Sequence, residues 1–279
     1  MARIYTISDK DTGNKHIRVI TNRATHDNPL HMHEYFEIEL ITKGKCKQLL
    51  NGTSYDISTG TIYFLSPVDF HKLCDIDEAI TLYNISFDHY FSSSAILQKL
   101  ISQNNVIINL DSEKYRECEK IIELLAESTV VSDEYTEKNI KNLLECLLIF
   151  ILRNMHDKQL NDVDSSELSP IQTGLQYMYL HYKENPSAYE VSKICGYSTE
   201  HFCRQFKNTT GKTYTHFLNL LKINHSKIML LTSNLSIIEI AEMCGFTSIS
   251  NFNRVFKDEV GLSPSEFKKQ NEKKKTGAK

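Results

Sequence analysis

Histidine and glutamate side chains cluster in a short stretch of the chain, HMHEYFE, at residues 31 to 37. His31, His33 and Glu37 occupy positions of the same parity, so on one unbroken strand their side chains point to one face. A further histidine, His71, follows on a later strand. Because buried imidazole and carboxylate groups need partners, these four residues are candidates for a polar binding site inside a β-barrel.

A second group of chemically interesting residues belongs to an internal repeat. GYSTEHFCRQFKNTTG at residues 196 to 211 is similar to GFTSISNFNRVFKDEVG at residues 245 to 261, with a period of about 49 to 50 residues. In each copy, a serine followed three residues later by glutamate predicts a capping box that opens a short helix, and a glycine then ends that helix in a tight turn. The boxes start at Ser187 and Ser236, and second helices are expected after Ser198 and Thr247.

The second helix of each copy is predicted to have one buried and one exposed face. Two phenylalanines four residues apart must face inward, and a rotation of about 100° per residue then defines the outward face. Two capped helices joined by a glycine turn, with arginine and amide groups outside, form a helix-turn-helix that can enter the major groove of DNA. The outward residues are Glu200, Cys203, Arg204 and Lys207 in the first copy, and Ser250, Asn253, Arg254 and Lys257 in the second.

Simpler interpretations of these side chains also exist. Arg204 and Arg254 can pair with neighbouring carboxylates on a solvated face, although their identical placement in both copies favours DNA contact. Exposed lysines such as Lys207, Lys257 and Lys222 are weaker candidates, since a phosphate contact reads no sequence.

The stretch between the two copies predicts a long helix. Residues 213 to 232 carry an apolar stripe at Phe217, Leu221, Ile228 and Leu231, which indicates a helix of roughly twenty residues. At a rise of about 1.5 Å per residue, it spans about 30 Å, close to one turn of B-DNA. Recognition helices at its two ends can therefore reach successive major grooves.

The first half of the chain has the pattern of a meander of short antiparallel strands. Alternating apolar runs begin at residues 16, 34, 46, 53, 61 and 79, and Asn51-Gly52 between two of them is a strong hairpin signal. From Asp111 the period becomes helical, and a second helix is expected from Asp133 to Met155. Its apolar stretch from Leu143 to Leu152 indicates either burial within its own domain or a dimer interface.

Composition and charge narrow the class of protein. With 41% hydrophobic and 24% charged residues, and with no secretory leader or membrane-spanning run, the chain is expected to be a globular protein of the cytoplasm. Seven cysteines without a CxxC pair indicate buried thiols. Residues 170 to 279 hold 15 Lys and Arg against 9 Asp and Glu, whereas the rest holds 17 against 26, so only the C-terminal part is expected to meet a polyanion.

Residues 170 to 269 resemble the DNA-binding domain of the AraC-type transcription factors, the family of the arabinose-operon regulator. The second copy carries the residues of that family's signature: Gly245, Phe246, Phe252, Arg254, Phe256, Lys257, Gly261 and Pro264. The resemblance implies base or backbone contacts from Glu200, Cys203, Arg204, Ser250, Asn253 and Arg254. The first copy departs from the pattern at Tyr214, and Glu200 and Cys203 are weak base readers, so its contacts are expected to be fewer or confined to phosphates.

HMHEYFEIELITKG is similar to the first motif of the cupin barrels, and residues 60 to 71 are similar to the second. In metal-binding cupins these four positions ligate a divalent cation, and three imidazoles with a carboxylate suit Fe, Mn, Ni or Zn. Three interpretations follow: a sensor that binds a polar ligand such as a sugar, as the arabinose-type resemblance implies; a metal-dependent enzyme; or a scaffold without a ligand. We favour the sensor, because buried polar groups need partners whatever the function and a fold alone confers no activity.

The sequence therefore predicts an α+β protein with two domains. Residues 1–158 are expected to form a cupin-like sensor and dimerisation domain, residues 159–169 a linker, and residues 170–279 an all-α DNA-binding domain with helix-turn-helix motifs at 187–211 and 236–261. The expected function is a homodimeric, ligand-responsive transcriptional activator that binds double-stranded DNA, with RNA polymerase as a further partner. No catalytic activity and no cofactor are expected; the alternatives are the metal-dependent cupin enzyme and a constitutive, ligand-free regulator.

Overall fold

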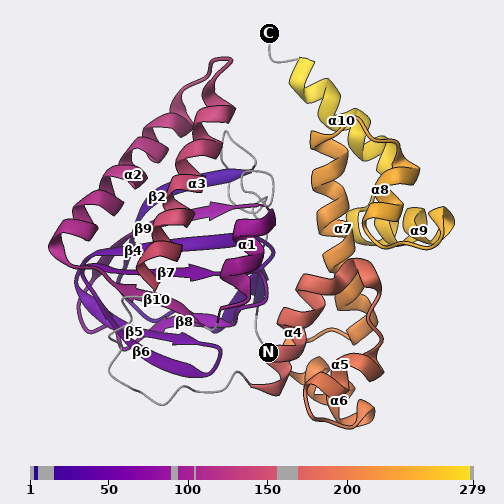
Figure 1. Ribbon diagram of the computed structural model, residues 1–279, viewed down its shortest axis with the longest axis horizontal. Coiled ribbons are helices and arrows are strands. Elements are labelled where there is room, and N and C mark those ends of the chain that lie inside the picture. Colours follow the sequence, from indigo (N-terminus) through magenta and orange to yellow (C-terminus); the bar gives the residue numbers. More distant parts are fainter. Residues whose placement is uncertain (1–2, 6–15, 89–93, 104, 156–168, 277–279) are drawn as a thin grey trace. The chain divides into compact units, whose positions relative to one another are not determined.

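The computed structural model describes residues 3–5, 16–88, 94–103, 105–155 and 169–276 of the 279-residue chain (Figure 1). Two compact units divide the chain, Met1–Gln172 and Thr173–Lys279. The linker expected at residues 159–169 lies outside the described residues, except for Ser169.

In the described part of the first unit, ten strands form two five-stranded sheets (Figure 1). The first sheet has the order β1-β3-β8-β5-β6 and the second the order β10-β7-β4-β9-β2. Neighbouring strands are antiparallel, except that β1 and β3 run parallel. The strands are Arg3–Tyr5 (β1), Ile17–Ala24 (β2), His31–His33 (β3), Phe36–Lys43 (β4), Lys45–Leu50 (β5), Thr53–Ser58 (β6), Thr61–Leu65 (β7), His71–Cys74 (β8), Ile80–Phe87 (β9) and Val106–Asn109 (β10).

The turn between β5 and β6 confirms the hairpin predicted at Asn51-Gly52. Both residues have positive φ, 53° for Asn51 and 91° for Gly52, and Leu50 pairs with Thr53 across the turn. Positive φ at both positions gives the turn the twist of the flanking strands. The pairing register is thereby fixed, and alternate residues of β5 are buried.

The expectation of one unbroken strand from His31 to Glu37 is wrong. β3 ends at His33, a bend occupies residues 34 and 35, and β4 begins at Phe36 in the other sheet. A seven-residue alternation cannot distinguish one strand from two short strands separated by a two-residue bend. His33 and Glu37 therefore come from different sheets.

In the described part of the first unit, α1 (Ser94–Ile101) lies between β9 and β10 in the chain, and α2 (Ser112–Val130) and α3 (Thr136–Asn154) follow β10. α2 and α3 form a hairpin that lies across the second sheet (Figure 1). The Asp111 carboxylate caps α2 by accepting from the backbone N–H groups of Glu113 and Lys114, each at 2.9 Å. α3 starts three residues later than expected, because Asp133 and Thr136 bond to each other in the turn that precedes it.

The buried face of α3 explains most of its apolar character. Six apolar side chains of this helix are buried within the unit: Ile140, Leu144, Leu147, Leu148, Phe150 and Ile151. Burial within the domain, one of the two alternatives for this helix, thus holds for these residues.

Within the described residues, no helix combines the length and the apolar character needed to cross a lipid bilayer.

The C-terminal part of the chain is helical. α7 is the long helix between the two copies of the repeat, with α5 and α6 packed near its start and α8 and α9 near its end (Figure 1). The helices are Pro170–His181 (α4), Tyr182–Glu184 (η3, a short 3-10 helix), Ala188–Ile194 (α5), Thr199–Thr210 (α6), Tyr214–Thr232 (α7), Ile237–Met243 (α8), Ile249–Val260 (α9) and Pro264–Thr276 (α10).

The repeat folds as two copies of the same helix pair. Ser187 and Ser236 cap α5 and α8 in complete capping boxes. Ser198 caps α6 as expected, but the cap of α9 is Ser248 and not Thr247. The caps of α5 and α8 are 49 residues apart and those of α6 and α9 are 50 apart, so the turn of the second copy is one residue longer.

α7 joins two small cores. Near its start, the ring of Phe217 meets that of Phe206 edge-on, with 5.4 Å between centroids. In its second half, Ile223 and Leu230 pack with the phenylalanines of α9. The predicted stripe is therefore right at Phe217 and Leu221 but wrong further on, where Ile228 and Leu231 are only partly buried.

Candidate functional site

α6 and α9 are the corresponding second helices of the two copies of the repeat. The inward phenylalanines are fully buried, which fixes the rotation of each helix and confirms their expected core role: Phe202, Phe206, Phe252 and Phe256. The eight candidate residues lie on the other side. Cys203 is partly exposed, and the others are exposed: Glu200, Arg204, Lys207, Ser250, Asn253, Arg254 and Lys257.

The two candidate arginines are held in similar ways. A guanidinium nitrogen of Arg204 lies 3.0 Å from Nδ1 of His201, one turn earlier on α6. Arg254 donates to Oδ1 of Asn251 at 2.9 Å and to a carboxylate oxygen of Asp258 at 3.2 Å. The Arg254–Asp258 pair agrees with the alternative that this arginine pairs with a neighbouring carboxylate. Both side chains are more than 60% exposed, however, so solvent strongly screens the attraction between them.

Each recognition helix ends in the same way. Gly211 and Gly261 follow α6 and α9 in the left-handed conformation, and each backbone N–H donates to the carbonyl of the lysine four residues earlier.

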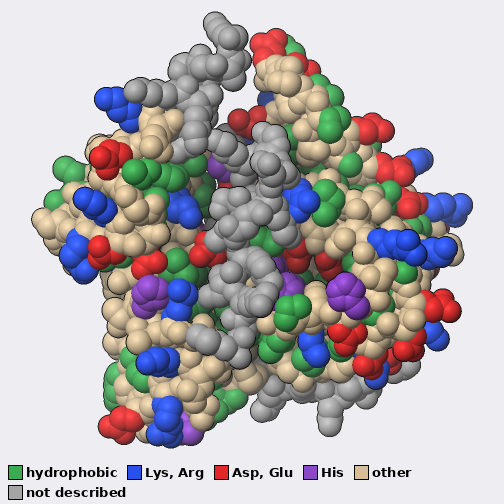
Figure 2. Space-filling view, turned by 180° about the vertical axis from the view of Figure 1, so that it is seen from behind, with side chains coloured by type: hydrophobic (Ala, Val, Ile, Leu, Met, Phe, Trp, Pro, Cys, Tyr) green, Lys and Arg blue, Asp and Glu red, His purple; other side chains and the backbone are tan. Residues whose placement is uncertain are grey.

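Acidic side chains (red) gather mainly over the surface of the first unit in Figure 2. On the face shown, this distribution agrees with the charge asymmetry of the sequence, in which the C-terminal helical part is basic and therefore suited to a polyanion.

Two residues of the helical unit have roles that sequence reading missed. Lys222, suggested above as a phosphate contact, is only 4% exposed and donates to the backbone carbonyl of Gly245 at 3.1 Å. Tyr214, where the family pattern departs, is buried, and its hydroxyl donates to the Pro186 carbonyl at 2.5 Å. Lysine in a helix is normally solvated, so the only signal for Lys222 was its place between buried neighbours.

Three of the four ligand-site candidates meet inside the first unit. Nε2 of His33 lies 3.1 Å from a carboxylate oxygen of Glu37, and Nε2 of His71 lies 3.6 Å from the same oxygen. All three side chains are buried. His33 is oriented by a bond from Nδ1 to the backbone carbonyl of Tyr35 at 2.6 Å and by stacking on the Tyr35 ring.

His31 borders this group of three residues. Nδ1 of His31 is 2.9 Å from the carbonyl oxygen of Pro29, and its ring centroid lies 4.2 Å from that of His71. Its side chain is partly exposed. His31 and His33 lie on the same strand, β3, and His31 pairs with His71 of β8, so His31 lies beside the group.

A buried polar network extends from Glu37 along the second sheet. The Asn84 amide donates to Glu37 and to Glu39 at 2.6 Å each, Ser86 donates to Asn84 at 2.9 Å, and the Tyr63 hydroxyl donates to Glu39. The sequence held a signal for these residues, because carboxylate and amide groups interrupt otherwise apolar strands in FEIELI and ITLYNISF. None of these network residues apart from Glu37 was among the predicted site residues.

The network sets the charge of the cluster. Burial raises the pKa of Glu37, but His33, His71 and Asn84 together outweigh it and hold that pKa well below its usual range. Burial, reinforced by His33 and His31, lowers the pKa of His71 far below its ordinary value. At neutral pH the cluster therefore offers an ionised carboxylate beside a neutral imidazole.

The donor set also fits a divalent cation. Three residues, His33, Glu37 and His71, each offer one ligand atom, and these three atoms lie within 4.8 Å of one another. Two imidazole nitrogens and a carboxylate oxygen are ligands that Zn, Fe, Mn or Ni accept. These three residues would hold such an ion, and His31 is not part of the converging group.

Two family models match this chain. A helix-turn-helix domain model matches residues 191–270, and an AraC-like ligand binding domain model matches residues 14–168, more than half of the chain. The chain belongs to the AraC family of transcriptional regulators. The first unit carries the ligand-binding domain of the family and the second its DNA-binding domain.

Curated relatives extend over both units of this AraC-family chain. The HTH-type transcriptional activator RhaR of Yersinia pseudotuberculosis is 24% identical over 90% of this chain and 88% of its own length. The HTH-type transcriptional activator RhaS of Escherichia fergusonii is 26% identical over 86% and 87%. A crystal structure of an apo ToxT variant from Vibrio cholerae covers 91% of this chain and 97% of its own, with 16% identity and a TM-score of 0.42.

These matches decide between the broad alternatives for the chain. Domains for ligand binding and DNA binding, and relatives named as activators, are those of a regulator rather than an enzyme. This AraC-family chain is therefore a DNA-binding transcriptional regulator with a ligand-binding domain.

Proposed function

We propose that this regulator reads DNA with the outward faces of α6 and α9 at once. The observation that carries the proposal is the paired placement of Arg204 and Arg254, exposed at the same position of two recognition helices whose buried faces match. Arginine contacts guanine edges and phosphates, and a helix-turn-helix places such residues in the major groove. The other contacts come from Glu200, Cys203, Lys207, Ser250, Asn253 and Lys257.

In vitro selection from a random pool of DNA duplexes tests this proposal. The 279-residue chain should enrich duplexes with two sub-sites about one helical turn apart. Fluorescence anisotropy on the enriched duplex should then give an affinity that falls steeply with salt. Enrichment of no motif by a folded protein would contradict the proposal.

The cluster of His33, Glu37 and His71 is proposed to bind a small polar effector such as a sugar. Buried hydrogen-bond donors and acceptors lie close together in this cluster, an arrangement that can bind the hydroxyl groups of such an effector. Gln48 supports this: its side chain is fully buried, and within the described residues neither of its polar atoms has a hydrogen-bond partner. Gln48 pairs with Leu73, two residues from His71 on the neighbouring strand, so both side chains lie on one face of the sheet.

Thermal-shift screening and metal analysis separate an organic effector from a metal ion. We expect a polyhydroxylated metabolite to raise the melting temperature of the parent protein but not of Gln48→Leu or His71→Phe, with no stoichiometric metal after dialysis against chelator. Tight metal at one ion per chain would instead show that the same three residues hold a cation. A parent protein that responds to neither would favour the ligand-free regulator.

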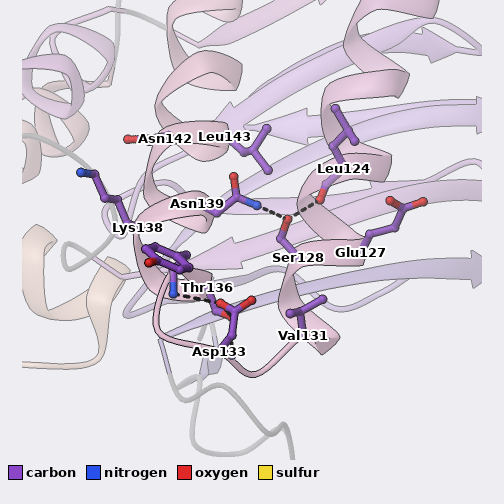
Figure 3. A pocket seen from close by; sticks show the side chains of 11 residues that line it. Leu124, Glu127, Ser128, Val131, Asp133, Thr136, Lys138, Asn139, Asn142 and Leu143 are labelled. Atoms are coloured by element: carbon purple, nitrogen blue, oxygen red, sulfur yellow. Dashed lines mark hydrogen bonds between the residues drawn. The ribbon is translucent and has the colours of Figure 1, made fainter.

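A homodimer through the α2–α3 hairpin is the proposed assembly. A groove of about 590 Å³ lies between the end of α2 and the start of α3 (Figure 3). Asn139 donates to Ser128, and Ser128 donates to the carbonyl of Leu124, which fixes its walls. Apolar side chains around it are at least half exposed: Leu124, Val131 and Tyr135. Such a patch suits a self-complementary contact.

Light scattering after size-exclusion chromatography tests the dimer. The parent is expected to have twice the chain mass, and Leu124→Arg is expected to be monomeric, because a charge would be buried at the interface. Leu124→Met keeps an apolar side chain and should stay dimeric. A monomeric parent would contradict this assembly.

Activation is the proposed outcome of DNA binding, as the names of the relatives suggest. Acting on DNA, the protein would work in the cytoplasm, with RNA polymerase as its partner at the promoter. A reporter gene placed downstream of the selected duplex should rise in expression with the parent protein and stay at baseline with Arg254→Ala. Lower expression of the reporter would show that the protein represses transcription, which would contradict the proposed activation.

A further inference from the structure

The two helix-turn-helix motifs meet at a small polar junction in the helical unit. The backbone carbonyl of Gly245, in the turn of the second motif, accepts from Asn185 Nδ2 at 2.7 Å and from Lys222 Nζ at 3.1 Å. Lys222 lies on α7, and Asn185 follows η3, just before the first motif. Three separate segments therefore converge on one carbonyl oxygen.

Lys222 is an unusual group for such a place. It is 4% exposed, its ammonium also donates to the Asn185 side chain, and it lies 5.0 Å from the centre of the Phe246 ring. In the part of the chain that the structure describes, no ion pair involves this lysine. A buried ammonium without a carboxylate depends on its hydrogen bonds, so displacement of any segment of the junction is costly.

Gly245 is fitted to this junction more tightly than its counterpart in the first motif. A Cβ at residue 245 would lie 2.5 Å from the carbonyl oxygen of Lys183 in η3, whereas a Cβ at Gly196 would meet nothing within 4 Å. Both glycines have positive φ, so the turn alone does not explain the difference. The turn of the second motif is packed against the η3 backbone.

The other side of the junction is anchored to the first motif. Asn185 has a left-handed backbone with φ of 56°. The next residue, Pro186, accepts the hydroxyl bond of Tyr214 at 2.5 Å, and the one after it, Ser187, caps α5. Consecutive residues thus connect the second motif, the start of α7 and the first motif.

We propose that Lys222 and Asn185 are positioning residues that fix the second helix-turn-helix motif relative to the first, and so set the spacing of the two DNA sub-sites that this regulator accepts. Neither residue touches DNA in this proposal. It rests on the proposed reading of DNA by both motifs. A role limited to stabilising the fold is the alternative.

Spacing series of DNA duplexes distinguish positioning from stabilisation. The probes are the duplex selected by the parent, versions with one or two base pairs added between the sub-sites, and a duplex with one sub-site only. Two added base pairs rotate one sub-site by about 70°, at roughly 10.5 base pairs per turn. The parent should lose at least about tenfold in affinity, because a rigid junction cannot follow that rotation.

The test variants are Lys222→Met, which keeps the apolar stem, and Asn185→Gly, which keeps the left-handed backbone. Each is expected to bind the selected duplex about fivefold more weakly, to lose less than about threefold on two added base pairs, and to bind the single sub-site like the parent. Lys227→Met is the matched control, because Lys227 is also on α7 but bonds to Asn224. It should keep the parental spacing profile.

Several outcomes would overturn the inference. If both variants keep the parental spacing profile, or lose the same factor on the single sub-site as on the pair, they act on stability alone. Circular dichroism identifies a variant that fails to fold, and the other variant then decides. If the folded parent prefers no pair of sub-sites, both this inference and the proposed reading of DNA fail, a result that differs from an unchanged profile.

Discussion

The two helix-turn-helix motifs of this chain share their caps and buried faces but differ in the turn and in the surroundings of the exposed arginine. Both open with a Ser-Glu capping box, bury two phenylalanines and end with a left-handed glycine. They differ in the turn, which is one residue longer in the second motif, and around the exposed arginine. There Asp258 pairs with Arg254, while Asn208 occupies the matching place in the first motif. The copies share their caps and buried phenylalanines and differ in the turn and in the residues of their outward faces.

Substituting the turn glycines should reveal the largest difference between the motifs. Positive φ costs a residue other than glycine about 1 to 2 kcal/mol, and this applies at both Gly196 and Gly245. Only at Gly245 does a Cβ overlap backbone, 2.5 Å from the Lys183 oxygen. We expect Gly196→Ala to lower the free energy of unfolding by about 1 to 2 kcal/mol and Gly245→Ala by about 3 kcal/mol or more.

Urea unfolding followed by far-ultraviolet circular dichroism measures both glycine variants. The parent provides the reference, and DNA-binding affinity at low denaturant shows whether the second motif is displaced. Equal losses for the two substitutions would mean that the second turn is not packed against η3, which would remove this difference between the motifs.

Removing each arginine tests whether the motifs read DNA unequally. Arg254→Ala should weaken binding to the selected duplex by about 1 to 3 kcal/mol and relax base preference at one position. Arg204→Ala should cost about 1 kcal/mol or less, because its neighbours Glu200 and Cys203 are weak base readers and its own contact is expected at phosphate. Anisotropy titrations on single-base variants of the duplex measure both effects.

Lys257→Ala serves as the contrast to the arginines. It should weaken binding to all sequences alike and reduce the slope of affinity against salt by about one ion. If Arg254→Ala and Lys257→Ala both bind like the parent, the outward face of α9 is assigned wrongly.

Exchanging the residue beside each arginine should have a smaller effect. Asp258→Asn frees Arg254 from an exposed ion pair and removes a negative charge near phosphate, so affinity should rise about two- to fivefold. Asn208→Asp builds the same pair around Arg204 and should lower affinity by a similar factor. Titrations at low salt measure both, and an effect of the same sign for the two changes would show that the charge beside the arginine does not set the affinity.

The capping boxes should respond alike, with the smallest difference. Ser187→Ala and Ser236→Ala are each expected to cost about 1 kcal/mol, measured by urea unfolding. Backbone and side-chain bonds from the serines lower the pKa of Glu190 and Glu239. A lowered pKa in the folded state means that the stabilisation is present above the ordinary value of 4.5 and is lost as pH falls below it. Unequal serine costs would show that the copies differ in folding as well.

Features that depend on near neighbours in the chain could be predicted from the sequence. The Asn51-Gly52 hairpin, the two capping boxes and the inward phenylalanines each depend on residues within one turn or two. The sequence prediction placed the α9 cap one residue too early. Equivalent residues of the two copies are 49 positions apart before the turn but 50 apart after it. The strand break after His33 was missed because alternation alone does not show a bend.

The sequence by itself determined the class of the protein, the two copies of the DNA-binding motif and the outward face of each recognition helix. The repeat and the outward faces follow from helical periodicity and local hydrogen bonds, and the class follows from the resemblance of the second copy to the AraC-type signature. Tertiary structure alone decided that His33 and Glu37 meet His71 from separate sheets and that Lys222 is buried at the Gly245 carbonyl. These contacts join segments distant along the chain, and their partners are chosen by packing, which no local pattern records.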